Sequence, residues 1–173
     1  MAAAPIVGEV TSTAFLLFFG PGGESAVEAQ LDRIRIAIGS GTLRRAAAAG
    51  FAPLIAVTAD PAGARAFGDA GAETIAPRTE PFHFGAELKR VVNERRIDRV
   101  CAIGAGAGAL LTAGDLRSLR DELERAPALV LSNNYYSADL VALTPTSALD
   151  AIALPATDNP LPRLLHILSL IHI

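Results

Sequence analysis

The chain has 173 residues, of which 51% are hydrophobic and 19% charged, so it is predicted to form one globular domain and not a disordered chain. The formal net charge of −3 gives no electrostatic basis for binding nucleic acid, and no apolar run approaches the ~20 residues of a membrane-spanning helix. The single cysteine, Cys101, excludes an intramolecular disulfide and argues against a cysteine metal cluster.

The first half of the chain alternates apolar runs with helical patterns. Residues 14–19 (AFLLFF) predict a buried strand that ends in Gly20-Pro21-Gly22-Gly23. A helix is expected from residue 24, with Val27, Leu31 and Ile34 as its apolar positions. The segment 39–41 (GSG) is expected to interrupt it before a second helix that ends at Gly50. The next expected elements are a strand at 53–58, a helix at 60–67 and a short strand at 73–76.

The second half continues the alternation. An amphipathic helix is expected at 84–96, and a buried strand at 100–103 runs into a segment of glycines and alanines at 104–108. The later expected elements are a helix that starts at Thr112 or Asp115 and ends at 125, a strand at 128–132, an antiparallel or edge strand at 139–143, and helical segments at 145–153 and 161–170. This order predicts an α/β fold of three layers, with a mostly parallel sheet and one late antiparallel strand.

The last six residues, LSLIHI, resemble the translation of a sequencing-adaptor read-through. On that interpretation residues 1–167 form a single domain, residues 168–173 are a non-native tail, and the natural protein continues past about residue 167. The alternative is a genuine apolar helix end.

The segment 104–108 is the first candidate for a ligand site, because ligands in open α/β sheets bind at the carboxyl ends of strands. Gly104 and Gly106 match the first two positions of the dinucleotide pattern G-x-G-x-x-G, which keeps a dinucleotide-dependent oxidoreductase as an alternative. The third position is Ala109, and the segment does not follow the first strand of the domain. Both points weaken that match.

Residues 106–116 (GAGALLTAGDL) resemble the pattern G-D-x-P-L-L-T-x-x-D-L of nucleotidyltransferases of the glycosyltransferase-A-like superfamily, such as the molybdenum cofactor guanylyltransferases and phospholactate guanylyltransferases. Residues 42–60 also look like that family's helix, Ala-Gly-Phe turn and second strand. The resemblance implies a Rossmann-like nucleotidyltransferase fold. It places nucleotide binding at Gly20, Gly22, Gly23, Gly104, Gly106 and Ala107.

The family's chemistry joins a nucleotide to a phosphorylated acceptor by attack on the α-phosphate and release of pyrophosphate. The resemblance implies Mg²⁺, held by carboxylates, to neutralise the charge that builds on the phosphate oxygens. In this chain the family's metal-binding Asp is replaced by Ala107, and Arg33 and Arg35 stand where a basic residue is expected after the first glycine loop. The resemblance therefore supports the fold better than the activity.

Three further positions are candidates for substrate or metal. Asn133 and Asn134 follow a predicted strand and suit contacts with a base or sugar, although an exposed polar loop explains them equally. Asp158 is a candidate metal ligand and Asn159 a candidate substrate contact, with a helix cap before Pro160 as the alternative. The turn at 20–23 is open to the same choice, between a backbone cradle for a base or phosphate and an ordinary turn.

The sequence therefore predicts a nucleotidyltransferase-like domain that binds a nucleoside triphosphate and, if active, a small phosphorylated acceptor. No nucleic-acid or membrane partner is expected. No basic region precedes the first apolar run, so a cytoplasmic location is expected instead of secretion. The rival from another class is a non-catalytic module that binds a nucleotide or sugar nucleotide.

Overall fold

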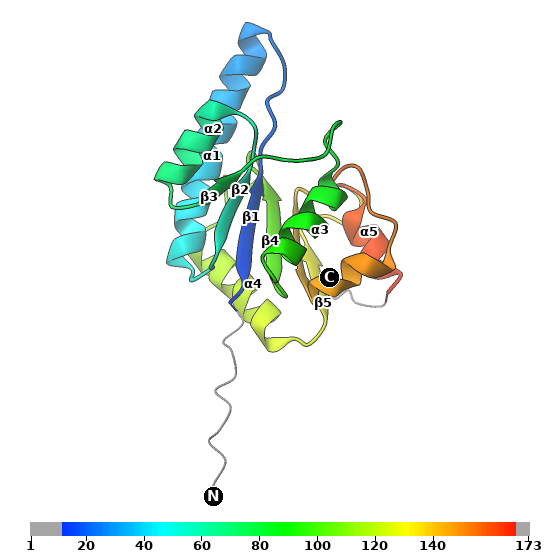
Figure 1. Ribbon diagram of the computed structural model, residues 1–173. Helices are drawn as coiled ribbons and strands as arrows, with labels where there is room; N and C mark the ends of the chain where they lie inside the picture. Colours follow the sequence, from blue (N-terminus) through cyan, green and yellow to red (C-terminus); the bar gives the residue numbers. More distant parts are fainter. Residues whose placement is uncertain (1–11, 169–173) are drawn as a thin grey trace, which may run out of the picture.

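The computed structural model describes residues 12–168, which form a six-stranded sheet with helices on both faces (Figure 1). The strand order is β3-β2-β1-β4-β6-β5. The first four of these strands are mutually parallel, and β6 is antiparallel to both β4 and β5. The strands are β1 (Ala14–Phe18), β2 (Leu54–Val57), β3 (Glu73–Ile75), β4 (Val100–Gly104), β5 (Leu129–Ser132) and β6 (Leu140–Thr144). The predicted fold class is confirmed.

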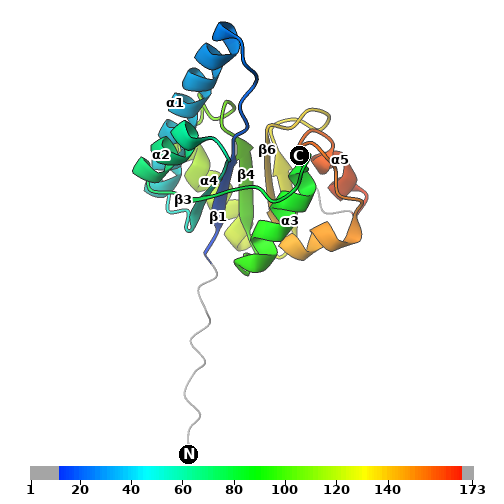
Figure 2. The ribbon, with the colours of Figure 1, turned by 45° about the horizontal axis from the view of Figure 1, so that its top comes forward.

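The helices divide between the two faces of the sheet, which gives the three layers (Figure 2). One face packs against α1 (Ala26–Ala48), α2 (Pro61–Asp69) and α4 (Ala113–Arg125), and the other against α3 (Phe84–Glu94), the 3₁₀ helix η1 (Thr146–Ala151) and α5 (Leu161–His166). All five residues of β1 are buried because they alternate between these two cores: Phe15 and Leu17 face the first, and Leu16 and Phe18 the second.

The expected break at residues 39–41 is wrong, because α1 is a single helix of 23 residues. A Cβ on Gly39 would lie 3.0 Å from Phe67 Cε1, 3.2 Å from Ala105 Cβ and 3.2 Å from Leu17 Cδ1. The missing side chain therefore lets α1 approach β1 and α2 closely, and this packing outweighs the low helix propensity of the glycines. Gly50, the expected glycine after the helix, has φ +89° and confirms the predicted end.

The N-terminal half of α1 extends beyond the sheet (Figure 1). Its apolar residues Val27, Leu31 and Ile34 are 70%, 51% and 46% exposed, so they pack against neither core. The helical spacing predicted the helix correctly. The burial in α1 comes instead from the later part, around Leu43 and Ala46.

The strand expected at 139–143 is β6, which is antiparallel as predicted but lies inside the sheet, and β5 forms the edge. The helix expected at 161–170 runs to His166, and residues 169–173, which include most of the suspected tail, lie outside the described part. Among residues 12–168, no helix is both long and apolar enough to cross a membrane.

Two glycine substitutions are expected to change stability in opposite directions. Gly68→Ala in α2 places its methyl where no atom lies within 4 Å, so it should stabilise by up to about 1 kcal/mol through helix propensity alone. Gly39→Ala should destabilise by about 1–2 kcal/mol because its three neighbours are fully buried and cannot retreat. Thermal unfolding of both variants checks this, and a rise in Tm for Gly39→Ala would contradict the close packing.

Candidate functional site

The loops that follow β1 and β4 meet at the carboxyl edge of the parallel strands. Phe18 pairs with Gly104 across the two strands, and the Ala105 N–H donates to the Phe18 carbonyl at 2.9 Å. The glycine-rich segments that begin at Gly20 and Gly104 are therefore neighbours, although they lie more than eighty residues apart in the sequence. The topology brings together the two segments that the sequence singled out.

A cavity of about 500 Å³ opens at this edge, within the range of small-molecule sites. Gly20 and Gly104 line it, and no atom outside their neighbours lies within 4 Å of a Cβ built on either one. The polar side chains in the lining are those of Arg35, Thr157 and Asp158. Most of the remaining wall is aromatic or proline: Phe18, Phe19, Phe82, Phe84, Pro21 and Pro77.

Arg35 on α1 is the cationic side chain of the lining. Its Nη1 donates to the Gly20 carbonyl and to Asp32 Oδ1, both at 3.0 Å, and its guanidinium lies 5.0 Å from the centre of the Phe19 ring. The side chain is still 37% exposed. Arg35 is thus held at the cavity with donors left to meet an anion. Arg33, the other arginine considered from the sequence, is exposed and bonds only Gln30 among the contacts described.

Asp158 supplies the carboxylate of the cavity, from the segment between η1 and α5. Its Oδ1 accepts the Asn159 N–H at 2.9 Å, and α5 has no side-chain cap, so Asp158 does not cap that helix. Burial raises the pKa of Asp158 and the carboxylate of Asp139 adds to the rise, against the lowering effect of the backbone N–H groups. The surroundings of Asp158 therefore disfavour its ionised form.

The loop after β4 turns away from the cavity toward α1. The Ala107 N–H donates to the Gly104 carbonyl at 3.0 Å, and Ala107 is exposed and lies outside the cavity lining. A Cβ on Gly106 would lie 3.4 Å from Arg35 Cγ, and one on Gly108 would lie 2.3 Å from Thr42 Oγ1. The later glycines therefore allow the loop to pack on α1, whereas Gly104 is the one open to a ligand.

The glycines of the turn at 20–23 likewise differ in role, since some serve local packing and one faces the cavity. The Gly22 N–H donates to both carboxylate oxygens of Asp32, at 3.0 and 3.2 Å. A Cβ on Gly23 would lie 2.6 Å from Glu28 Oε1, so this glycine makes room for the capping box of α1. Gly22 and Gly23 thus serve the local turn, and Gly20 faces the cavity.

The predicted asparagines lie at the same sheet edge but outside the cavity lining. Asn133 Oδ1 accepts the N–H groups of Asp139 and Leu140, and Asn134 Oδ1 accepts those of Tyr136 and Ser137. Their carbonyl oxygens thus shape the β5–β6 hairpin. Asn159 Oδ1 accepts the Ser137 hydroxyl at 3.2 Å and links that hairpin to the Asp158 segment.

Two features of the site were missed from the sequence. The aromatic wall was not foreseen, because it combines the end of β1 with the loop before α3. Asp139 was not among the candidates from the sequence, yet its carboxylate acts electrostatically on Asp158. The one available signal was the polar segment between β5 and β6, because it placed Asp139 at the carboxyl edge of the sheet.

No protein-family model matches the chain, and no curated protein does. Solved structures do match, at low sequence identity. A CMP:2-keto-3-deoxy-manno-octonic acid synthetase complexed with CTP is 15% identical, with 91% of this chain and 86% of that chain covered and a TM-score of 0.60. A cytidylyltransferase from Leptospira borgpetersenii is 12% identical over 92% and 73% of the two chains, with a TM-score of 0.65.

Rv0371c from Mycobacterium tuberculosis, solved in complex with manganese, is 16% identical over 89% of this chain and 81% of its own, with a TM-score of 0.55. These similarities establish a nucleotidyltransferase-like fold for the chain. They agree with the expected Rossmann-like α/β class. The strand order also differs from the all-parallel 3-2-1-4-5-6 order of dinucleotide-binding domains.

Proposed function

We propose that this domain binds a nucleoside triphosphate in the cavity between the ends of β1 and β4. One observation carries the proposal: four separate segments bring Gly20, Arg35, Gly104 and Asp158 to a single cavity. Exposed backbone at the two glycines suits close approach of a ligand, and Arg35 suits a phosphate. The aromatic and proline wall suits the base, because the base of any nucleotide can stack on an aromatic ring.

The bound cation in this proposal is Mg²⁺, with Asp158 as ligand. Mg²⁺ is commonly held by one or two carboxylates together with substrate phosphates, and Asp158, which lines the cavity, meets that need. No group of three or more acidic, histidine or cysteine side chains suited to a metal occurs within residues 12–168. The donor set thus fits a cation whose coordination the nucleotide's phosphates complete. When bound, it would neutralise charge on the phosphate oxygens.

If the domain is active, an oxygen of the acceptor phosphate attacks the α-phosphate, and pyrophosphate leaves. In this reaction Arg35 would stabilise negative charge on the phosphates, and the apolar wall would exclude water from the base. The exposed Ala107 in place of an acidic residue favours the second candidate, a module that binds a nucleotide or sugar nucleotide without transferring it.

Titration with ATP, GTP, CTP and UTP, with and without Mg²⁺, separates these functions. Metal-dependent binding with pyrophosphate release on adding phosphorylated acceptors supports the enzyme, and binding without turnover supports the module. Binding of NAD but of no triphosphate would favour the oxidoreductase alternative and contradict the proposal.

Ala107→Asp tests the alignment with the nucleotidyltransferase pattern. If Ala107 stands in the place of a metal-binding Asp, the new carboxylate should strengthen the dependence of triphosphate binding on Mg²⁺, by about tenfold for one additional charged contact. Ala109→Asp, at an exposed position two residues along the same loop, is the control for added charge. An equal response of the two variants would argue against the alignment.

A further inference from the structure

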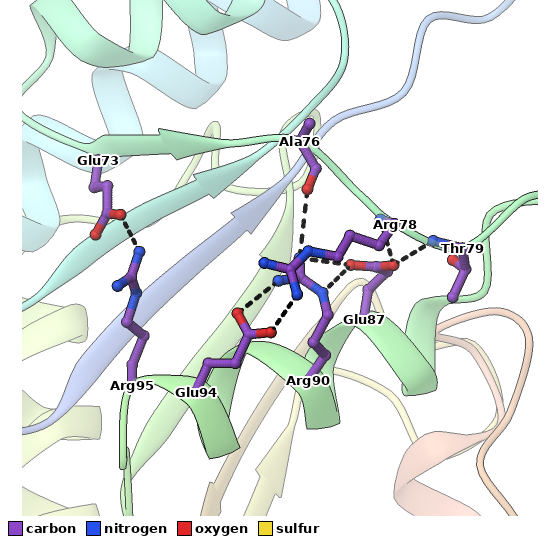
Figure 3. Close-up of polar contacts among 8 residues, drawn as sticks. All are labelled: Glu73, Ala76, Arg78, Thr79, Glu87, Arg90, Glu94 and Arg95. Atoms are coloured by element: carbon purple, nitrogen blue, oxygen red, sulfur yellow. Dashed lines mark hydrogen bonds and ion pairs between the residues drawn. The ribbon is translucent and has the colours of Figure 1, made fainter.

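A fully buried carboxylate, Glu87, lies in the first turn of α3 beneath the loop that joins β3 to α3 (Figure 3). Its Oε1 accepts the backbone N–H groups of Arg78 at 2.7 Å and Thr79 at 2.6 Å. Its Oε2 accepts Arg90 Nε at 2.9 Å and Nη2 at 2.7 Å. A buried carboxylate is tolerated only when it is paired and hydrogen-bonded, and Glu87 meets both conditions.

The charges around Glu87 are balanced by a second carboxylate on the same helix. Arg90 also bonds Glu94 Oε2 at 2.9 Å, and Arg78 Nη1 bonds Glu94 Oε1 at 2.6 Å. Arg95 pairs with Glu73 and ties the end of α3 to β3 (Figure 3). Two arginines thus satisfy two glutamates within the cluster, so it leaves no net charge to attract a phosphate. Its contacts instead point to the backbone of the loop.

The loop held in this way forms one wall of the cavity. Pro77 and Phe82 line the cavity on either side of the two residues whose N–H groups Glu87 accepts. Thr79 Oγ1 in turn accepts the His83 N–H at 2.9 Å, so the loop is also fixed next to Phe82. Phe82 is 49% exposed and touches Phe18 edge-on, at 6.4 Å between ring centres. Residues 76–79 have no regular secondary structure, so these contacts set the position of the wall.

We propose that Glu87 is a positioning residue for the ligand: it fixes the β3–α3 loop so that Pro77 and Phe82 present a preformed apolar wall to the base. This inference rests on the proposed nucleotide binding at the cavity. A preformed wall binds more tightly because the loop does not have to be ordered when the ligand arrives.

The chemistry of the side chain explains why a carboxylate serves here. A single carboxylate can accept two backbone N–H groups on one oxygen and an arginine on the other, whereas glutamine offers one acceptor oxygen and a donor that would face Arg90. Burial raises the pKa of Glu87, but the bonds from Arg90, Arg78 and Thr79 outweigh it and leave the pKa below its ordinary value. The anchor is therefore ionised at neutral pH.

Glu87→Gln tests the inference, with Glu94→Gln as the matched control. Glu94 lies on the same helix and bonds the same two arginines, but it is 40% exposed and makes no bond to the loop backbone among the contacts described. In Glu87→Gln, amide hydrogen exchange in residues 76–83 should rise about tenfold or more, and the affinity for the best-bound of ATP, GTP, CTP and UTP should fall about tenfold. Glu94→Gln should leave both unchanged.

A stability defect alone would not give this pattern, because the Mg²⁺-dependent part of the Tm rise at saturating triphosphate, which acts through Asp158, should stay the same in Glu87→Gln. Thr79→Val provides a second variant if Glu87→Gln does not fold, since it removes only the acceptor for the His83 N–H and should lower affinity about threefold. Unchanged loop exchange in Glu87→Gln, or faster exchange with unchanged affinity, would overturn the inference. Failure of the wild-type protein to bind any triphosphate would overturn the proposed function as well. The exchange measurement would in that case still show whether Glu87 fixes the loop.

Discussion

Replacement of Asp158 by asparagine is expected to abolish the additional stabilisation that Mg²⁺ should confer on the wild-type protein in the presence of a bound triphosphate. A ligand at a hundredfold excess over its Kd stabilises the folded state by about 2.7 kcal/mol, which corresponds to roughly 5–10 °C in Tm for a chain of this size. Asp158 is the carboxylate that lines the cavity, so its removal should bring this shift close to zero. Thermal unfolding at a saturating concentration of triphosphate, with Mg²⁺ and with a chelator, measures this shift directly.

The same substitution should also stabilise the metal-free protein at neutral pH. Burial and Asp139 raise the pKa of Asp158, so the folded state holds this proton more tightly than the unfolded state does. Stability therefore falls as the pH rises from the ordinary aspartate pKa through the raised value in the folded protein. Asparagine removes this penalty, so the chelated variant should unfold at a higher temperature than the wild type at pH 7 and at a similar temperature in acid.

Two controls make the result specific to Asp158. Asp150→Asn removes a carboxylate on η1 that pairs with Lys89, and it should leave the Mg²⁺ shift intact. Asp139→Asn should weaken the shift without abolishing it, because Asp139 acts on Asp158 through charge. A full Mg²⁺ shift in Asp158→Asn would contradict the proposed role of the Asp158 carboxylate as a metal ligand.

The sequence predicted the sheet well because most of its strands are largely apolar runs, and such runs have few alternatives when both faces are covered. It failed at Gly39, where helix propensity indicated a break but contacts with Leu17 and Phe67 require a glycine inside a helix. It also gave no sign that Val27 and Leu31 extend beyond the sheet. Both outcomes depend on tertiary contacts that a local pattern does not contain.

Only the part of the site that follows from the order of strands and loops could be predicted from the sequence. The rule that ligands bind at strand carboxyl ends directed attention to Gly20 and Gly104, and both residues line the cavity at that edge. It could not divide the glycines between ligand approach and packing, because Gly108 and Gly104 look alike in sequence yet only Gly108 abuts Thr42. The role of Glu87 was out of reach for the same reason, since its partners Arg78 and Thr79 come from a loop with no pattern of its own.

Arg35→Met should cause the largest loss of triphosphate affinity among single substitutions at the cavity. Arg35 is the cation of the lining, and a hydrogen bond to a charged group contributes about 1.5–3 kcal/mol, or roughly 10- to 150-fold in Kd. Methionine keeps an unbranched side chain of similar reach that can still pack on Phe19. The loss should grow with the number of phosphates, so the Kd for a triphosphate should rise more than that for the nucleoside.

Arg33→Met is the matched control, two residues earlier on the same helix. Arg33 is exposed and bonds Gln30, so its loss removes the same charge from the protein without touching the cavity. Equal effects of the two substitutions would mean that net charge alone drives binding, and would contradict a direct contact with Arg35. A selective effect at Arg35 that shrinks little in high salt would instead indicate a short-range contact, because salt screens distant charges far more than partly buried ones.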